Sequence, residues 1–398
     1  MAELLMVEEA QRLILERVRP LGSERVPIER ASGRILAEAA RAAVDLPPFP
    51  SSAMDGFALR SADTPGELPV VARIAAGVPA PRELRSGEAM AIATGGVVPE
   101  GADAVIPFED VVEHDNNIQV RDAVAPGASV RPRGGDAHAG DTVVPAGARL
   151  GPAQLGALAA AGVGEVACGA RPRASVLTTG TELRRPGEPL GPGEVYEANG
   201  VLLSAQLASA GAEVERLAPV ADDEDAHRGA LARGLESDLL VTSGGVSVGP
   251  HDLVRRVEAE LGVEEVFWRV AVKPGKPVSF GFRGHTLVFG LPGNPVSSLV
   301  GFELFVRPAV LALQGHAAPL PAFEPGRLAV AIKRNARRDE LVRARSRAAD
   351  DGTVLLEPLA GQDSHMIVRA AAADTLVLLP RGDGELAAGA PVRYLRLS

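Results

Sequence analysis

The alternation of strand-like and helix-like segments between residues 173 and 242 is the feature that most limits how this chain can fold. Short apolar runs alternate with segments whose apolar residues recur at helical spacing. The predicted order is strand 174–178, helix 200–210, strand 213–220, helix 223–235 and strand 238–242. This order predicts an α/β domain with a doubly wound parallel sheet, covered by helices on both faces. We expect Asn199 to cap the first of these helices and Gly211 to end it.

Two loops, Thr242–Asp252 and Leu291–Ser298, each join an apolar strand to a helix and are rich in glycine, proline and serine. Such loops expose backbone N–H groups that can bind a phosphate or another oxyanion, and ligands of parallel sheets bind beyond the carboxyl ends of the strands. An ordinary strand-to-helix turn is the alternative. Neither loop has the ending of an ATP-binding P-loop or the dinucleotide fingerprint. The candidate anion-binding residues are Ser243, Gly244, Gly245, Ser247, Pro292, Gly293, Asn294 and Pro295.

Three acidic residues, Glu182, Asp222 and Asp252, lie at or just beyond predicted strand ends on the same edge of the sheet. Carboxylates repel a neighbouring phosphate unless a hard cation lies between them, so the arrangement predicts Mg²⁺ held by these acids and the substrate. For any one of these acids alone, a helix N-cap or a first-turn charge is the better explanation. Their convergence on one edge favours the metal site.

Lys273 and Lys276 flank a Pro-Gly pair, and a second proline follows at Pro277. The prolines fix the backbone, so less entropy is lost when both ammonium groups meet one anion. A pair of solvated surface lysines is the alternative. We predict a preformed cationic site here.

The remaining sequence predicts three further parts around the α/β domain, which we place at 173–317. A helical and linker domain combines 1–26 with 141–172, since an amphipathic helix is expected near the N-terminus and another at 152–162. A mostly β domain is inserted at 27–140, and short alternating runs predict a small β-barrel domain at 318–398.

Composition restricts the classes of partner. The net charge of −10 argues against a general nucleic-acid surface. The single cysteine, Cys168, has no partner for a disulfide, which is typical of a reducing compartment, so we expect a cytoplasmic protein. The acidic N-terminus is unlike an export signal, and we expect no membrane span.

Several other polar positions cannot be assigned from local rules. Asp55 lies in a stiff proline-rich loop, and Thr94 and Asp136 lie in glycine-rich turns. A basic run ends with Arg343, Arg345 and Arg347, alternate residues of one predicted strand, for which we expect protection of a sheet edge against aggregation. No Ser-His-Asp arrangement or metal-spaced His/Cys cluster is evident.

Taken together, six motifs resemble the MoeA family, the molybdopterin molybdenumtransferases related to the E domain of gephyrin. They occur in family order and span most of the chain. The motifs are Ser52–Ala58, Thr94–Gly96 continuing through Pro99–Val105, Thr179–Leu183, Ser243–Gly249, Lys273–Pro277 and Pro292–Ser297.

The resemblance implies a Mg²⁺-dependent transferase that converts adenylylated molybdopterin and molybdate into molybdenum cofactor with release of AMP. It implies an elongated four-domain homodimer with a cross-subunit active site, and it is compatible with substrate handover from a molybdopterin adenylyltransferase. By motif position, Glu182, Asp222 and Asp252 handle Mg²⁺ and the pyrophosphate, and Ser243, Gly244, Gly245 and Ser247 hold the pterin phosphate. Asp55, Thr94 and Asp136 come from the partner subunit, and Lys273, Lys276, Arg343 and Ser364 surround molybdate.

Two other functions remain open from the sequence. The first is adenylylation of molybdopterin by ATP, which related α/β domains perform. The second is a non-catalytic scaffold that resembles gephyrin's E domain. The chain also departs from the usual family pattern at Phe57, Gly135, Thr181 and Arg269, and none of these positions is a proposed metal ligand.

Overall fold

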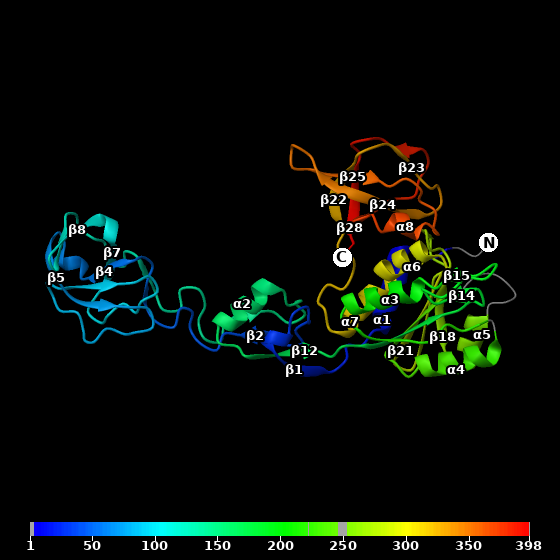
Figure 1. The fold of residues 1–398 in the computed structure, drawn as a ribbon, viewed down its shortest axis with the longest axis horizontal. Helices are drawn as coiled ribbons and strands as arrows, with labels where there is room; N and C mark the ends of the chain where they lie inside the picture. The colour runs from blue at the N-terminus through cyan, green and yellow to red at the C-terminus, as the bar shows by residue number, and fades with distance from the viewer. Residues whose placement is uncertain (1–3, 222, 246–252, 398) are drawn as a thin grey trace. The chain divides into compact units, whose positions relative to one another are not determined.

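The computed structural model describes residues 4–221, 223–245 and 253–397 (Figure 1). Three candidate site residues, Asp222, Ser247 and Asp252, therefore lie outside the described residues. The chain divides into two compact units. Unit 1 contains Met1–Glu24, Gly33–Ala37 and Cys168–Ser398, and unit 2 contains Arg25–Ser32 and Glu38–Ala167. The boundaries of the four predicted domains stay predictions.

A six-stranded sheet forms the centre of unit 1. Its order is β16 (Glu213–Arg216), β13 (Arg173–Thr178), β17 (Leu239–Ser243), β21 (Thr286–Leu291), β20 (Ser279–Arg283) and β18 (Glu264–Trp268). The first four strands are parallel, as the alternation predicted. The last two are antiparallel, because β20 follows β18 and precedes β21 without a crossover helix.

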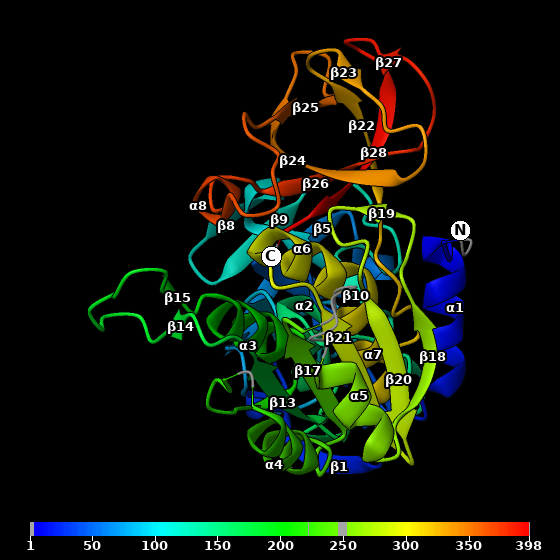
Figure 2. The same ribbon diagram turned by 90° about the vertical axis from the view of Figure 1, so that its right-hand side faces the viewer.

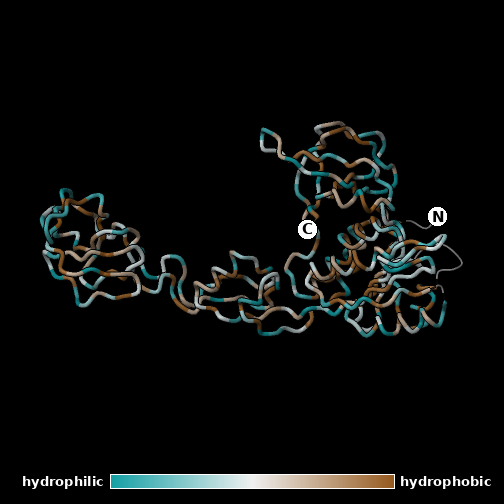
Figure 3. The backbone as a smooth tube through the Cα atoms, in the orientation of Figure 1, coloured by the Kyte–Doolittle hydropathy of each residue, from teal (hydrophilic) through white to brown (hydrophobic). Residues whose placement is uncertain are grey.

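Helices cover both faces of this sheet, which confirms the doubly wound arrangement. Adjacent residues of β13 and β17 belong to different cores, since successive strand residues point to opposite faces. Val176 and Val241 share one core with Leu203 of α3, whereas Leu177 and Leu240 share the other with helices α4 and α5. The helices are α1 (Val7–Arg17), α3 (Asn199–Ser209), α4 (Glu224–Gly234), α5 (Leu253–Glu260), α6 (Pro295–Gly301) and α7 (Arg307–Leu313). In Figure 3 the central strands of this unit are largely hydrophobic and its outer loops hydrophilic.

A π-helical segment, Phe302–Val306, joins α6 to α7. The resulting helix, Pro295–Leu313, is long and apolar enough to cross a membrane by length and composition. However, 78% of its most apolar window is buried inside the protein, as in the core helix of a globular domain. The sequence analysis did not anticipate a segment of this length.

The C-terminal part of unit 1 is a closed barrel, as predicted. Figure 2 shows its strands arranged in a ring. The strands are β22 (Glu324–Leu328), β24 (Asp339–Ala348), β25 (Val354–Pro358), β26 (Thr375–Leu379) and β28 (Pro391–Arg396). The short strand β19 (Val272–Lys273) extends the barrel sheet by pairing with Asp339 and Glu340. Smaller elements are β23 (Ile332–Lys333), β27 (Glu385–Leu386) and α8 (Ile367–Ala370).

The expectation that the arginines of β24 protect a sheet edge is wrong for Arg343, and it stays a prediction for Arg345 and Arg347. Residues 340–344 of β24 pair with β26, and residues 344–348 pair with β25. At Arg343 the strand therefore pairs within the closed ring, whereas Arg345 and Arg347 pair with β25 alone. Arg343 is fully buried, while Arg345 and Arg347 are exposed.

Unit 2 is mostly β, as predicted. Its main sheet has the order β7 (Ala104–Pro107), β4 (Gly56–Leu59), β6 (Ala89–Ile92), β5 (Gly66–Ile74), β9 (Asn117–Val120) and β8 (Val111–His114). Phe57 and Leu59 pack with Leu68 and Ile118 in one of its cores. The predicted helix at 152–162 is α2 (Pro152–Ala160), with Gly162 at φ +77° just beyond its end. Short pairs elsewhere are β1 (Ser23–Pro27) with β12 (Glu165–Gly169), β2 (Ala40–Arg41) with β11 (Thr142–Val144), and β3 (Ser51–Ser52) with β10 (Val130–Arg131).

A substitution at Gly56, at the start of β4, tests how closely the central strands of unit 2 pack. A Cβ at Gly56 would lie 2.0 Å from the carbonyl oxygen of Ile106, whereas one at Gly164 would meet nothing within 4 Å. We expect Gly56→Ala to lower the free energy of unfolding by about 1–3 kcal/mol, since the paired strand must shift. Gly164→Ala is the control. Equal midpoints of urea unfolding for the two variants would contradict the close approach.

Candidate functional site

The carboxyl ends of the four parallel strands form the edge of the sheet on which the predicted residues converge. After β13, Thr179 forms an isolated bridge with Val220, and the N–H of Gly180 donates to the Val220 carbonyl at 3.0 Å. The N–H of Thr179 donates to the Ser243 carbonyl at 3.1 Å. Backbone hydrogen bonds thus continue the sheet past its last regular residues and hold three loops in one layer.

The Gly244-Gly245 turn requires glycine at both positions. Both residues have positive φ values, +98° and +65°. A Cβ at Gly244 would lie 2.7 Å from the Thr179 carbonyl oxygen, and one at Gly245 would lie 2.4 Å from a methyl group of Val254. The N–H of Gly244 is used within the fold, since it donates to the Leu291 carbonyl at 3.1 Å. The turn therefore packs directly against the loop after β13 and the start of α5.

Hydrogen bonds of Ser243 and Asn199 join the two glycine loops. The Ser243 hydroxyl donates to the Pro292 carbonyl at 3.1 Å and accepts from Asn199 Nδ2 at 2.8 Å. Asn199 Nδ2 also donates to the Gly293 carbonyl at 2.7 Å, and Ser298 donates to the Pro292 carbonyl. The helix-cap prediction for Asn199 is wrong, because Ala198 is the N-cap and the Asn199 side chain reaches across to the loops. The Ser243 side chain is buried and also links the two glycine loops.

The second loop, Pro292–Pro295, leads to the barrel. Asn294 Nδ2 donates to the Ser364 hydroxyl at 2.9 Å, and the N–H of Val296 donates to the Ser364 carbonyl at 3.0 Å. A Cβ at Gly293 would lie 3.8 Å from Gly244 Cα, so a side chain at Gly293 would contact the first glycine turn. Ser364 and Asn294, both predicted site residues, are therefore brought together.

The lysine segment and these two residues line one cavity of about 330 Å³, which we call the lysine pocket. Its lining is Lys273, Pro274, Gly275, Lys276, Pro277, Pro292, Asn294, Ser297, Arg338, Gln362, Asp363 and Ser364. Lys273 pairs with the buried Glu340 at 2.8 Å. In the part of the chain that the structure describes, the Lys276 ammonium has no protein partner. The pocket therefore carries uncompensated positive charge, as an oxyanion requires.

Arg338 is a pocket residue that the sequence analysis did not single out. It belongs to the basic run that was assigned to edge protection, and it precedes the barrel strand β24 by one residue. Its guanidinium donates weakly to the Val272 carbonyl at 3.5 Å, which leaves its other donors for a ligand. The only sequence signal was its position five residues before Arg343 in a conspicuously basic segment.

Arg343, predicted to surround molybdate, holds the wall of the lysine pocket instead of lining it. Its side chain is 1% exposed. The guanidinium donates to the carbonyls of Met366 at 2.7 Å, Gly361 at 2.8 Å and Asp363 at 3.2 Å, and its Nε donates to Gln362 at 3.3 Å. Burial lowers the pKa of Arg343, an effect that the nearby Asp363 opposes. A planar donor with this geometry fixes the segment 361–366, which carries Ser364.

In unit 2 the structure brings two of the three predicted residues together. The N–H of Thr94 donates to Asp55 Oδ1 at 2.7 Å. This bond fixes the Asp55 carboxylate at the tip of the loop before β4, with its second oxygen available. Asp136 is exposed, and its N–H donates to the Leu46 carbonyl at 2.9 Å.

Glu182 is the one described residue of the predicted metal-binding trio. It is exposed, its carboxylate lies against Gly180, and the described residues provide no hydrogen-bond or ion-pair partner for it. An unpaired carboxylate beside the glycine loops is a suitable oxygen donor for Mg²⁺. Within 4–221, 223–245 and 253–397, no group of three His, Cys, Asp or Glu residues has metal-binding geometry. Asp222 and Asp252, the other predicted ligands, are outside those ranges.

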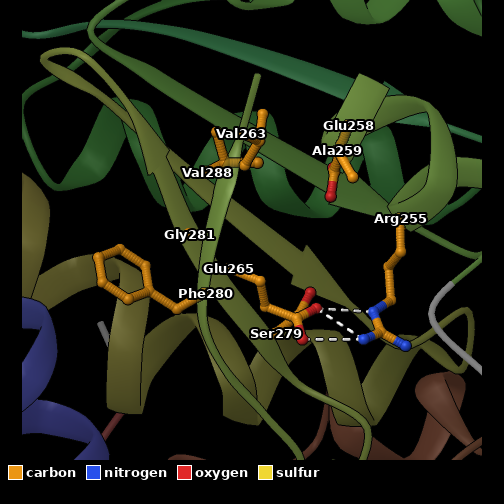
Figure 4. Close-up of a pocket in the computed structure, with 9 residues that line it drawn as sticks. All are labelled: Arg255, Glu258, Ala259, Val263, Glu265, Ser279, Phe280, Gly281 and Val288. Atoms are coloured by element: carbon orange, nitrogen blue, oxygen red, sulfur yellow. Dashed lines mark hydrogen bonds and ion pairs between the residues drawn. The ribbon is translucent and has the colours of Figure 1, made fainter. Parts of the chain in front are cut away.

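A separate small cavity lies between α5 and the antiparallel strands β18 and β20. Figure 4 shows Arg255 and Glu265 facing each other, with contacts of 2.7–2.9 Å between the guanidinium and the carboxylate. Phe280, Val263 and Val288 form apolar walls. Because its arginine is already paired with a carboxylate, this cavity does not offer an anion site comparable with the lysine pocket.

Comparison with known proteins identifies the family of a chain with these glycine loops and this lysine pocket. Family profiles match in three consecutive parts: the MoeA N-terminal region (domain I and II) at 5–162, a probable molybdopterin binding domain at 175–312, and the MoeA C-terminal region (domain IV) at 325–397. The chain belongs to the MoeA family. It is therefore an enzyme of molybdenum cofactor biosynthesis.

Relatives of the MoeA family extend over the whole length of this chain. The chain is similar to the molybdopterin molybdenumtransferase of Haemophilus influenzae, with 33% identity over 98% of both chains. Molybdopterin molybdenumtransferase 2 of Mycobacterium tuberculosis is 38% identical over 81% of this chain and 82% of its own. A crystal structure of the molybdopterin biosynthesis MoeA protein from Pyrococcus horikoshii aligns with a TM-score of 0.81 at 31% identity, covering 99% of each chain.

Replacement of Arg343 tests its role in holding the pocket wall. Lysine has one ammonium and cannot reach the carbonyls of Gly361, Asp363 and Met366 together, so Arg343→Lys should leave buried acceptors unpaired. We expect backbone hydrogen exchange in segment 359–367 to quicken by about tenfold, which corresponds to about 1.4 kcal/mol of local stability. Arg345→Lys, at an exposed position further along the same strand, should leave exchange unchanged. Identical exchange in the two variants would contradict the positioning role.

Proposed function

We propose that this MoeA enzyme transfers molybdenum from molybdate to adenylylated molybdopterin and releases AMP in a Mg²⁺-dependent step. The observation that carries the proposal is the connection between the two halves of the site. The glycine loops, suited to phosphate, are joined through Asn294 and Ser364 to a cationic pocket, suited to a tetrahedral dianion. The names of the full-length relatives support the reaction class.

Molybdate binding is assigned to the lysine pocket. Molybdate carries two negative charges on four oxygens, and the pocket offers the ammonium groups of Lys273 and Lys276 and the guanidinium of Arg338. Glu340 neutralises part of the Lys273 charge, so Lys276 and Arg338 provide most of the attraction. Asp363 also lines the pocket, and its negative charge limits the affinity of the pocket for anions.

The pterin phosphate and the pyrophosphate linkage are assigned to the Gly244-Gly245 loop. The glycines allow a phosphate to approach the backbone closely, since no side chain covers it. Glu182, with Asp222 and Asp252, would hold Mg²⁺, which when bound supplies charge neutralisation for phosphoanhydride cleavage. The chain's own contribution is to orient the dithiolene toward the lysine pocket, through the rigid connection between the two loops.

Asp55, Thr94 and Asp136 are assigned to the active site of a partner subunit in a homodimer. The hydrogen bond between Thr94 and Asp55 supports this role, because it fixes a carboxylate at an exposed loop tip. Substrate handover from a molybdopterin adenylyltransferase and a cytoplasmic location belong to the same proposal.

Two other functions predict different measurements. A molybdopterin adenylyltransferase would consume ATP, and a non-catalytic scaffold would release no AMP at all. Lys276, without a protein partner among the described residues, favours the insertase over the scaffold, since a scaffold has no need of a preformed cationic pocket.

Replacement of Lys276 tests the molybdate assignment. Lys276→Ala removes one charge-assisted contact, so we expect the KM for molybdate to rise about tenfold or more in molybdate-dependent AMP release from adenylylated molybdopterin with Mg²⁺. Lys333→Ala, which removes an exposed lysine of the barrel, is the matched control. An unchanged KM in Lys276→Ala would remove this residue from the molybdate site, and absence of molybdate-dependent AMP release by the unaltered protein would refute the reaction.

Mixing two inactive variants tests the cross-subunit site. If Asp55 acts on the partner's lysine pocket, Asp55→Asn and Lys276→Ala homodimers should each retain about a tenth or less of the unaltered activity when molybdate is well below its KM. After subunit exchange, a mixed dimer retains one site with both residues intact, so activity should return to roughly one quarter of the unaltered level under random reassortment. Light scattering monitors the dimer during exchange. No recovery in verified mixed dimers would show that both residues serve the same subunit's site.

A further inference from the structure

A second basic cavity, of about 430 Å³, lies at the carboxyl end of β16 in unit 1, and we call it the arginine pocket. Its lining consists of Arg185, Pro186, Arg216, Leu217, Ala218 and Pro219. Two of the six residues are arginines and none is acidic. Its size falls within the range of small-molecule sites, and its combination of apolar walls with a few charged groups is typical of them.

Arg216 is held rigidly at this cavity. It pairs with Glu197, whose side chain is 1% exposed. The other Glu197 oxygen accepts the N–H of Gly200 at 2.5 Å, at the start of α3. Because this ion pair occupies only part of a five-donor guanidinium, Arg216 keeps donors for a ligand while its position is fixed. Asn199, the residue before Gly200, joins the two glycine loops, so the start of α3 supports both the arginine pocket and the loops.

Arg185 is the second cation of the pocket. It lies just after β14 (Leu183–Arg184), in a flap whose other strand is β15 (Val195–Tyr196), and Figure 2 shows these strands projecting from the sheet beside α3. Its backbone is fixed, since its N–H donates to Glu188 at 3.1 Å. Among the described residues its guanidinium has no hydrogen-bond or ion-pair partner. A cation without a partner beside an apolar cavity is available for a ligand.

The apolar walls of the pocket suit a planar ring. Pro186 and Pro219 lie on the two chain segments that form the cavity, and Leu217 is buried between them and the sheet. Guanidinium groups stack on aromatic rings as well as donating hydrogen bonds to phosphate. The pocket therefore fits a nitrogen heterocycle that carries a nearby phosphate.

The strand order places this pocket and the lysine pocket on opposite sides of the glycine turn. The order is β16, β13, β17 and β21, so the arginine pocket follows β16, the Gly244-Gly245 turn follows β17, and the lysine pocket includes residues after β21. Three strand spacings separate β16 from β21, roughly 14 Å. A ligand whose phosphates bind at the Gly244-Gly245 turn can therefore occupy both pockets only if one end enters the arginine pocket and the other end enters the lysine pocket.

We infer that the arginine pocket binds the nucleotide end of the substrate, with the adenine against Pro186 and Pro219 and a phosphate oxygen or ribose hydroxyl near Arg185 and Arg216. This inference rests on the proposed function, because the lysine pocket is there assigned to molybdate and the end of the substrate that receives molybdenum must face it. The pterin is a planar heterocycle too, and the experiment distinguishes the two rings.

AMP binding to the full-length protein with Mg²⁺, measured by isothermal titration calorimetry, tests the inference. We expect Arg185→Gln to weaken AMP binding about tenfold, because one charge-assisted contact is lost. Ala218→Trp, which fills the exposed side of the cavity, should weaken it at least as much. Arg171→Gln is the matched control, since Arg171 is exposed near the opposite, amino-terminal edge of the same sheet. Arg216 is left intact, because its removal would leave Glu197 buried without a partner.

The binding measurements test the arginine pocket independently of whether the protein catalyses the proposed reaction. AMP binding that is unchanged in both pocket variants would overturn it, whether or not the unaltered protein is active. Intact AMP binding with weakened binding of non-adenylylated molybdopterin would overturn it in favour of the pterin. Weakened AMP binding with normal KM for molybdate supports it. If the unaltered protein releases no AMP in the presence of molybdate, the proposed function fails, while the AMP titrations still report on the pocket.

Discussion

The hydrogen bonds around Ser243 are the interaction on which the site depends. One buried hydroxyl joins the ends of β17 and β21, and Asn199 adds the start of α3 to the same network. The bonds that Ser243 makes with Asn199 and Pro292 are buried, so losing one of these groups would leave another unpaired at a cost of about 1–3 kcal/mol. The network joins the glycine turns mainly through side chains and carbonyl oxygens. Rigidity and an open backbone therefore coexist at this edge.

The cations around the lysine pocket have two different roles, since some hold the protein backbone and others remain available for a ligand. Arg343 is buried and uses its donors on backbone carbonyls, while Lys276 and Arg338 keep donors for a ligand. A buried guanidinium needs several acceptors to offset its loss of hydration, and the segment 361–366 supplies them. The pocket wall is then as well defined as the loops on the other side. Pairing of Lys273 with Glu340 further limits the number of free cations.

Regular secondary structure followed from the sequence where periodicity was clear. The strands 174–178 and 238–242 and their helices agree with β13, β17, α3 and α4 within a few residues, since alternate burial on two faces imposes a strong pattern. The antiparallel orientation of β20 and β18 could not be predicted, because an apolar run does not show whether its strand is parallel or antiparallel to its neighbours. Asn199 was misassigned for a related reason. Its local position is that of a cap, but its partners lie 44 and 94 residues away.

The sequence by itself determined the glycine turns, the lysine segment, the order of strands and helices in the α/β part, and the presence of a small barrel. These features depend on backbone conformation and on the spacing of apolar residues, which are local properties. Only the tertiary structure decided which polar groups face a cavity and which are hydrogen-bonded to other groups of the protein. Arg338 and Arg343 lie five residues apart in one basic run, yet one lines the pocket and the other supports it. That difference arises from packing of the barrel against residues distant in the chain, which no local pattern records.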